Sequence, residues 1–311
     1  MPFVRFACRL ALVAVWAIGA GVSLGSASFA APPSFVNDIS PYVWNGLMID
    51  LSNRTAVITG GSSGIGRATA VLLSRCGARV FVGDSAPQEE NQATFAELGI
   101  TEVACDVRRE ADVSALVDQA VVATDRLDIA VHSAGIVLVR QIPEVMEEEW
   151  DACFDTNLKG AFLLAKHAIV PMRASGGGSI VHISSNAGLL PRAHDPVYST
   201  SKAAVIAFTR SLALSHGIDK IRVNAVCPGP VSETGIVNAD LDAAADRGAA
   251  EQGLITASPI ARAIGRMITP DEVAQAVLYL VSDAAVLVTG TMIAIDGGKS
   301  LGVPPEPPAA E

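Results

Sequence analysis

The sequence predicts an α/β fold, a doubly wound parallel sheet of about seven strands flanked by helices in a single domain. Three observations lead to this class. Short apolar runs alternate with longer helical patterns from residue 51 onward, the runs are rich in β-branched residues, and no linker interrupts the alternation before residue 298. Alternation of this kind gives right-handed crossovers between parallel strands. The expected strands span residues 55–59, 79–84, 102–107, 127–135, 179–185, 221–229 and 292–298.

Helices are expected between these strands, where apolar residues recur at helical spacing. Gly217 is expected to cap the end of one helix, and Pro270 suits the first turn of another. The alanine-rich segment 235–265 contains no aromatic residue and is interpreted as a mobile helical lid. The expected helices span roughly residues 65–76, 110–124, 147–173, 197–216 and 271–282.

Composition bounds the function. Half of the 311 residues are hydrophobic and 17% are charged, so the chain can build a large core. The formal net charge of −10 argues against a nucleic-acid partner, which needs a basic face. The five cysteines form no CxxC pair and no zinc-like spacing with histidine, so no metal site is expected. Cys76, Cys105 and Cys227 are expected to be small buried hydrophobes in a reducing compartment.

The ends of the chain read differently from its middle. Arg5 and Arg9 precede the apolar run "LALVAVWAIGAGV", and small residues follow at 28–30, which is a signal-peptide pattern. The run is too short to predict a stable membrane span. A misassigned start, with the enzyme beginning at Met48, and an ordinary extension are the alternatives. Residues 1–47 are therefore set apart as a signal-like or misassigned extension, 48–300 as the folded domain and 301–311 as a flexible proline-rich tail.

The glycine-rich turn "VITGGSSGIGRA", residues 57–68, lies between an expected strand and an expected helix. Gly60 permits the tight turn, Gly64 lets the backbone approach a ligand, and Gly66 lets the helix pack on the strand. The N–H groups at the start of the helix attract an anion, and a diphosphate is the natural guest. The turn therefore predicts a dinucleotide site.

The second strand ends in Asp84, 24 residues beyond Gly60. A carboxylate at this distance meets the ribose hydroxyls of NAD and repels the 2′-phosphate of NADP. No arginine or lysine stands at Ser62, Ser63 or Ser85 to compensate. NAD is expected as the cofactor, with NADP as the less favoured alternative, and because this cofactor is kept in the cytoplasm, so is the protein. Export or membrane anchoring is the alternative if residues 1–30 are a real signal.

A candidate reacting centre comes from "YSTSK", which places Tyr198 and Lys202 one above the other on a helix face. Ser185 ends a preceding strand, and Asn157 lies further upstream. Hydride transfer to a carbonyl builds negative charge on oxygen, so a proton donor is needed there. A nearby ammonium and a cationic nicotinamide favour the phenolate, and together they are expected to lower the tyrosine pKa. The alternative interpretation is a surface Tyr–Lys pair with a buried serine.

Together "TGGSSGIG" and "YSTSK" resemble the short-chain dehydrogenase/reductase family, and the likeness covers nearly all of residues 51–298. The resemblance implies a Rossmann-like catalytic domain and a catalytic tetrad of Asn157, Ser185, Tyr198 and Lys202. It implies that Lys202 hydrogen-bonds the nicotinamide ribose, that Ser185 holds the substrate oxygen, and that Asn157 holds a water linking Lys202 to solvent.

The resemblance also implies cofactor contacts, with Asp106 beside the adenine and Val107 packing on it. His132 and Ser133 stand where the family commonly has asparagine, and His132 is interpreted as a satisfied core or strand-end histidine rather than a catalytic one. The family often has threonine two positions after Val231, where this chain has Glu233, so either the loop shifts by one to Thr234 or Ser232 substitutes. The expected contacts are Gly60, Ser63, Gly64, Ile65, Gly66, Asp84, Asp106, Val107, Ser133, Ala134, Gly135, Tyr198, Lys202, Pro228, Gly229 and Val231.

The function expected from these residues is NAD-dependent interconversion of a small or medium secondary alcohol and its ketone. The alternatives are an NADP-linked 3-oxoacyl-carrier-protein reductase and a non-catalytic NAD-binding sensor on the same fold. Substrate contacts are expected from residues 186–197 and 235–265. Four arginines could each reach an acid group there: Arg192, Arg247, Arg262 and Arg266. Surplus apolar residues on the expected helices 147–173 and 197–216, together with the family resemblance, favour a homotetramer or homodimer.

Overall fold

The computed structural model describes residues 43–44, 47–242 and 244–302. Strands β1 (Val43–Trp44) and β2 (Leu47–Met48) form a short antiparallel pair. Most of the predicted extension, residues 1–47, and most of the predicted tail, residues 301–311, lie outside the described residues. The choice between a signal and a start at Met48 therefore stays a prediction.

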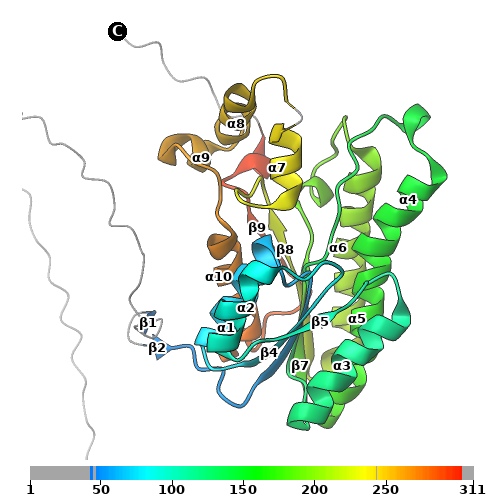
Figure 1. The fold of residues 1–311 in the computed structure, drawn as a ribbon, viewed down its shortest axis with the longest axis vertical. Helices are drawn as coiled ribbons and strands as arrows, with labels where there is room; N and C mark the ends of the chain where they lie inside the picture. The colour runs from blue at the N-terminus through cyan, green and yellow to red at the C-terminus, as the bar shows by residue number, and fades with distance from the viewer. Residues whose placement is uncertain (1–42, 45–46, 243, 303–311) are drawn as a thin grey trace, which may run out of the picture. The chain divides into compact units, whose positions relative to one another are not determined.

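The main sheet has seven strands in the order β5-β4-β3-β6-β7-β8-β9, and every neighbouring pair is parallel (Figure 1). All seven predicted strands form, which confirms the fold class. Five end earlier than expected, and after β5 and β6 the residues that have left the sheet line a cavity. The strands are β3 (Thr55–Thr59), β4 (Arg79–Asp84), β5 (Thr101–Ala104), β6 (Ile129–His132), β7 (Gly178–Ile183), β8 (Ile221–Pro228) and β9 (Met292–Ile295).

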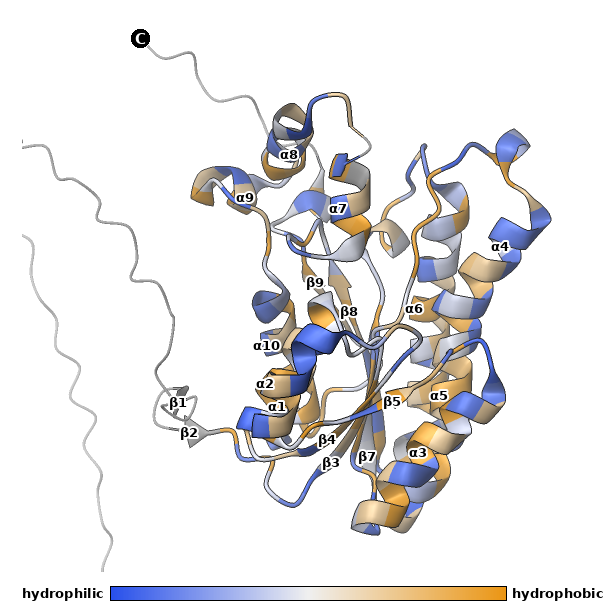
Figure 2. Ribbon diagram, in the orientation of Figure 1, coloured by the Kyte–Doolittle hydropathy of each residue, from blue (hydrophilic) through white to orange (hydrophobic). Residues whose placement is uncertain are grey.

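Helices cover both faces of the sheet (Figure 1). One buried apolar cluster joins α1 and α10 to one face, and a second joins α3 and α5 to the other. Figure 2 shows hydrophobic residues concentrated in the sheet and on the helix sides next to it. The two clusters bury the branched and aromatic side chains that the sequence pattern placed inside. These helices are α1 (Gly64–Arg75), α3 (Glu110–Thr124), α5 (Gly160–Ala174), α6 (Pro196–His216) and α10 (Pro270–Val281).

The segment expected to be one helix over 147–173 is interrupted. It forms α4 (Glu147–Phe154), a π-helical turn (Asp155–Lys159) and then α5. A further helix, α2 (Gln92–Leu98), was not predicted. Segment 235–265 forms three helices, as expected of a helical lid: α7 (Gly235–Asp242), α8 (Arg247–Thr256) and α9 (Pro259–Ile264).

Gly217 caps the end of α6, as predicted, but without the left-handed conformation that is common at this position. Gly217 has φ −58°, an ordinary right-handed value, and it begins a short 3₁₀ turn that extends α6. The left-handed residue that ends this turn is Lys220, with φ 58°. The chain therefore reverses three residues later than the position of the glycine suggested.

The topology fixes where a ligand can bind. The chain order along the sheet reverses between β3 and β6, and the loops that leave their carboxyl ends diverge there. In a doubly wound sheet this divergence opens a crevice at the carboxyl edge. Within the described ranges, no helix has both the length and the hydropathy needed to cross a membrane.

Candidate active site

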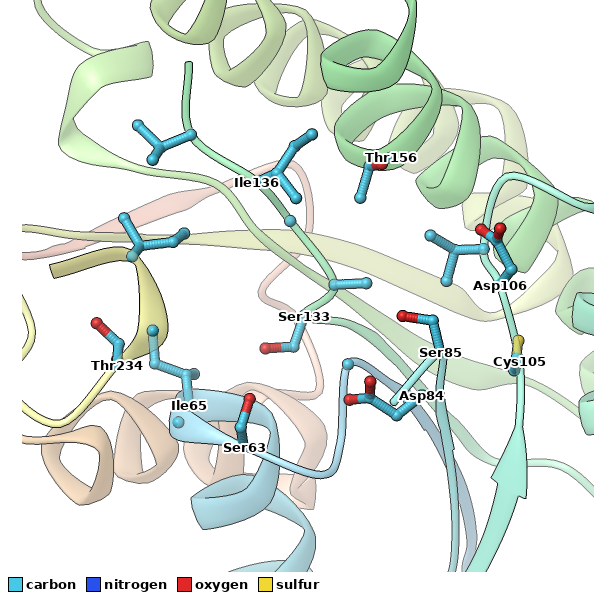
Figure 3. A pocket seen from close by; sticks show the side chains of 18 of the residues that line it. Ser63, Ile65, Asp84, Ser85, Cys105, Asp106, Ser133, Ile136, Thr156 and Thr234 are labelled. Carbon is cyan, nitrogen blue, oxygen red and sulfur yellow. The ribbon is translucent and has the colours of Figure 1, made fainter. Parts of the chain in front are cut away.

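A cavity of about 620 Å³ opens at this carboxyl edge (Figure 3). Its lining comes from the loops after β3, β4, β5 and β6, together with the start of α7. The structure brings together ten of the residues predicted to contact a cofactor: Gly60, Ser63, Gly64, Ile65, Asp84, Asp106, Val107, Ser133, Ala134 and Gly135.

The glycine-rich turn has the backbone that its sequence requires. Gly60 and Gly64 have φ +67° and +49°, and a Cβ on Gly60 would lie 2.5 Å from the backbone nitrogen of Ala134. Helix α1 begins at Gly64 without a side-chain cap bond, so N–H groups of its first turn remain for a ligand. Gly66 does not line the cavity. A Cβ there would lie 2.0 Å from the carbonyl oxygen of Gly60, so Gly66 lets the helix pack against the turn.

Asp84 ends β4 and lines the cavity beside Ser63 and Ser85 (Figure 3). Its Oδ2 accepts a hydrogen bond from the Ser62 backbone N–H at 3.2 Å, and its Oδ1 accepts one from the Ala86 N–H at 3.1 Å. Asp106 lies further along the lining and pairs with Arg108 at 2.7 Å. The hydrogen bonds from the Arg108 side chain lower the pKa of Asp106.

In the loop after β8, Thr234 lines the cavity, whereas Ser232 and Glu233 do not. Glu233 adopts a left-handed conformation, with φ 57°. The methyl group of Thr234 lies 3.2 Å from the position that a Cβ on Gly64 would take. This placement favours Thr234 over Ser232 as the substitute, and its contact with a cofactor stays a prediction. Three further lining residues, Gly235, Ile236 and Ala239, belong to segment 235–265, from which substrate contacts were expected. Sequence reasoning did not assign the others, which follow motif positions without a distinctive residue type: Ser85, Cys105, Arg108, Ile136, Val137 and Thr156.

Three predicted contacts after β8 do not line this cavity. A Cβ on Gly229 would lie 3.0 Å from the Cα of Asp296, and Val231 pairs with Ile268 in an isolated parallel bridge. Pro228 is the last residue of β8. The contacts of Pro228, Gly229 and Val231 with a nicotinamide stay predictions.

The predicted reacting residues meet beside the cavity. The Lys202 Nζ lies 5.9 Å from the centroid of the Tyr198 ring and donates a hydrogen bond to the Ile183 carbonyl oxygen at 3.0 Å. A Cβ on Gly135 would lie 3.1 Å from both the Lys202 Nζ and the Asn157 Oδ1. Because Gly135 lines the cavity, the lysine and the asparagine adjoin its inner end.

Burial dominates the electrostatics of this centre. It lowers the pKa of Lys202 to about 8, because the ammonium is desolvated. It raises the pKa of Tyr198, and a hydrogen bond with Ser185 opposes this rise. The protein's own groups therefore raise the tyrosine pKa, because desolvation of the phenolate outweighs the Ser185 hydrogen bond and the charge of Arg192. The lowering expected from Lys202 together with a cationic nicotinamide stays a prediction.

Asn157 lies in the π-helical turn, and its side chain is fully hydrogen-bonded. Its Nδ2 donates to the Ile136 carbonyl oxygen at 3.0 Å and to the Ser201 Oγ at 2.9 Å, while its Oδ1 accepts from the Ile136 N–H at 2.9 Å. Asn157 thus fixes the segment that follows β6. Its expected role in holding a water stays a prediction.

The four arginines named as possible acid ligands differ in their contacts. Arg192 pairs with the buried Asp195 at 3.2 Å, at the start of the helix that carries Tyr198. Arg266 pairs with Glu272 at 2.8 Å, and Arg247 pairs with Asp242. Arg262 donates to the Thr256 carbonyl oxygen at 3.3 Å. Arg192 is therefore the arginine that lies next to the reacting residues in the chain.

Sequence and structure comparisons find relatives that cover most of the chain. Residues 60–300 match the family model described as enoyl-(acyl carrier protein) reductase. The chain is 38% identical to a cis-4-hydroxycyclohexanecarboxylate dehydrogenase of Sinomonas cyclohexanicum, over 79% of this chain and 96% of that one. It is 35% identical to a cyclopentanol dehydrogenase of a Comamonas species, with 80% and 97% covered. It is 33% identical to an NAD-dependent glycerol dehydrogenase of Listeria innocua, with 81% and 96% covered.

A solved structure of a short-chain type dehydrogenase/reductase from Mycobacterium marinum superposes with a TM-score of 0.72 at 34% identity, covering 81% of this chain and 97% of that one. The fold and the site define an oxidoreductase with a dinucleotide cavity at the carboxyl edge of a parallel sheet. The chain belongs to the short-chain dehydrogenase/reductase family. The dehydrogenases of this family use nicotinamide cofactors, and the cavity suits one because its glycine turn leaves no room for a Cβ on Gly60 and presents the start of α1.

Proposed function

We propose that the protein is an NAD-dependent oxidoreductase that interconverts a secondary alcohol and its ketone, with Tyr198 as the proton donor and acceptor. The observation that carries this proposal is a run of contacts that reaches the cavity lining: Ser185 contacts Tyr198, the Lys202 ammonium lies 5.9 Å from the Tyr198 ring, and Lys202 adjoins Gly135, which lines the cavity. Ser185 and Tyr198 are both buried, which suits groups that exchange a proton in a water-poor site.

Each side chain has a defined task. A bound nicotinamide would supply or accept the hydride. Tyr198 gives a proton to the substrate oxygen in reduction and removes one in oxidation, and Ser185 holds that oxygen next to the phenol. The Lys202 ammonium stabilises the phenolate when the proton leaves, and it is fixed for this by the Ile183 carbonyl. Asn157 holds the backbone of Ile136, which lines the cavity.

Asp84 supports NAD rather than NADP. Its carboxylate lines the cavity and forms no ion pair within the described ranges. A 2′-phosphate placed beside an uncompensated carboxylate is repelled, whereas a ribose hydroxyl can donate a hydrogen bond to it. The name of the Listeria relative also specifies NAD.

The relatives support a secondary alcohol carried on a small ring as the substrate. The names of the Sinomonas and Comamonas proteins specify cyclic secondary alcohols. The test is a rate assay on cyclopentanol, cyclohexanol and hydroxycyclohexanecarboxylates with NAD+ and NADP+, followed by the absorbance of the reduced nicotinamide. Turnover of 3-oxoacyl-carrier-protein with NADPH in preference to every alcohol would support the carrier-protein reductase instead. NAD+ binding with no turnover on the whole panel would support the non-catalytic sensor.

Replacing Tyr198 by phenylalanine tests the proposed proton transfer. The variant loses only the phenolic hydroxyl, so kcat is expected to fall by a factor of about 10² or more while NAD+ still binds. The matched control is Tyr279→Phe on α10, whose side chain is 39% exposed and distant in sequence from the reacting residues. Activity of Tyr198→Phe within tenfold of the parent would contradict the assigned role.

We further propose that the protein acts in the cytoplasm as a homo-oligomer. Apolar side chains remain exposed on α4 and α5, where Trp150, Phe162 and Val170 are 41%, 45% and 66% exposed. Other apolar residues of the helices expected to form the subunit interface pack inside the subunit instead: Leu163 is buried, and Phe208 packs on the core. Light scattering on the purified protein measures the assembly directly, and a monomer at micromolar concentration would contradict the proposal.

A further inference from the structure

Ser62, in the glycine-rich turn, is held by two carboxylates, one at its backbone and one at its side chain. Its N–H donates to the Asp84 Oδ2 at 3.2 Å, and its Oγ donates to the Glu102 Oε1 at 2.5 Å. Ser62 is 1% exposed, so the hydroxyl has little access to water. Asp84 ends β4 and Glu102 lies on the neighbouring strand β5. The sequence motif singled out Asp84 alone, and Glu102 has no motif position.

Neither carboxylate has a counter-ion in the described part of the chain. Over the residues that the structure describes, the ion pairs include neither Asp84 nor Glu102. The nearest cation tied into the same network is Arg67, whose Nε donates to the Asn91 Oδ1 at 2.6 Å, while the Asn91 amide donates to the Ser62 carbonyl oxygen at 2.7 Å. Arg67 thus contacts an amide rather than either acid. The turn carries two negative charges at its edge and one positive charge beyond Asn91.

Glu102 does not line the cavity, so its charge can act on a ligand there only through space. Asp84 and Glu102 bond to atoms of a single serine, so they lie within the roughly 10 Å over which 0.1 M salt screens a charge. Asp84 lines the cavity at the end where the proposed function places the adenosine ribose. A phosphate on that ribose would therefore feel the carboxylate of Glu102 as well as that of Asp84.

We propose that Glu102 is a second determinant of cofactor choice, whose fixed carboxylate behind Ser62 adds to the repulsion that Asp84 exerts on a 2′-phosphate. The proposal rests on the proposed function, because it requires a dinucleotide in this cavity. It predicts that neutralising Asp84 alone leaves NADP at a disadvantage. It also separates two roles of Glu102: its charge acts on the phosphate, and its hydrogen bond holds Ser62.

Glu102→Gln removes the charge and keeps an oxygen that accepts from the Ser62 hydroxyl. Dissociation constants for NAD+ and NADP+ are measured by isothermal titration, without turnover. The ratio Kd(NADP+)/Kd(NAD+) is expected to fall at least about threefold in Glu102→Gln, and further in Asp84→Asn/Glu102→Gln than in Asp84→Asn alone. The difference between parent and variant is expected to shrink in 0.5 M salt, about the range where screening becomes strong.

Glu97→Gln is the matched control, because Glu97 is an exposed acid on α2 that the network does not include, and its ratio is expected to equal that of the parent. Glu102→Ala, which loses the bond to Ser62, is expected to weaken both dinucleotides. A ratio in Glu102→Gln within experimental error of the parent overturns the proposal.

If the parent binds neither dinucleotide, the proposed function fails too. If NAD+ binds with its normal affinity and the ratio does not move, only the role of Glu102 fails. The salt dependence of the ratio in the parent gives a second measurement should a variant fold poorly, and a ratio that salt leaves unchanged also overturns the proposal.

Discussion

At the scale of single residues, the site depends on backbone segments that pack so closely that a side chain does not fit between them. Gly66 is the strictest case, because a Cβ there would lie 2.0 Å from the carbonyl oxygen of Gly60 and 3.1 Å from the Cα of Gly61. Backbone atoms cannot rotate away as a flexible side chain can. The contact therefore sets how closely α1 approaches the turn, and so where the N–H groups of its first turn point.

Gly66→Ala is expected to destabilise the fold by about 2 kcal/mol, in the range measured for overpacked sites, and to weaken NAD+ binding because α1 moves. The control is Gly253→Ala in α8, where an added Cβ meets nothing within 4 Å. That substitution is expected to be neutral or stabilising by about 0.5–1 kcal/mol, since alanine favours helix over glycine. Urea unfolding measures both, and equal effects at the two positions would contradict the packing argument.

At the scale of elements, the π-helical turn between α4 and α5 is the feature that sequence reasoning could not supply. The apolar spacing over 147–173 predicted a continuous helix, because one extra residue in a turn barely changes that spacing. Asn157 was predicted from its motif, yet its two bonds to the backbone of Ile136 follow from the tertiary fold. Helix α2 was missed because its seven residues are too few to show a period. Strand positions were predictable, since buried β-branched runs are a local signal.

Asn157→Ala tests what the π-helical turn holds. It leaves the N–H and the carbonyl of Ile136 without their side-chain partner, which is expected to cost about 1–3 kcal/mol of stability. It is also expected to raise the Kd for NAD+, because Ile136 lines the cavity. Lys159→Ala in the same turn is the control. Its exposed i,i+4 ion pair with Asp155 contributes about 0.5 kcal/mol or less. Calorimetric titration and chemical unfolding compare the two, and an unchanged Kd in Asn157→Ala would count against the positioning role.

At the scale of the whole molecule, the centre of the sheet contains two histidines that solvent does not reach. His132 and His182 are register partners on β6 and β7, with ring centroids 6.5 Å apart. Each Nδ1 has a threonine hydroxyl partner at 2.9 Å, Thr59 for His132 and Thr209 for His182, and each Nε2 has no hydrogen-bond partner among the described residues. The interpretation of His132 as a core or strand-end histidine is therefore confirmed, since it is buried and ends β6, but the expectation that its polar atoms are satisfied was wrong for Nε2. Burial lowers the pKa of His132 to about 3 and that of His182 to about 4.

These two pKa values make the stability of the fold depend on pH in a defined window. Above pH ~6.5 both histidines are neutral in the folded and the unfolded chain. As the pH falls below that value, the unfolded chain binds protons that the folded chain refuses, so the free energy of unfolding decreases. Each histidine removes at most about 1.4 kcal/mol per pH unit until its folded pKa is reached. The acids with lowered pKa values, such as Asp106 and Glu272, add their loss only near pH 4 and below. The free energy of unfolding is therefore expected to fall steeply from pH 6.5 to 4.5.

His132→Asn, which keeps a side-chain partner for Thr59, is expected to lose about half of that slope. His194→Asn, at an exposed loop position, is expected to keep all of it. Chemical unfolding at half-unit pH intervals measures the slope. If the parent protein is equally stable at both ends of the window, the two histidines bind protons in the folded chain as readily as in the unfolded chain, and the prediction is wrong.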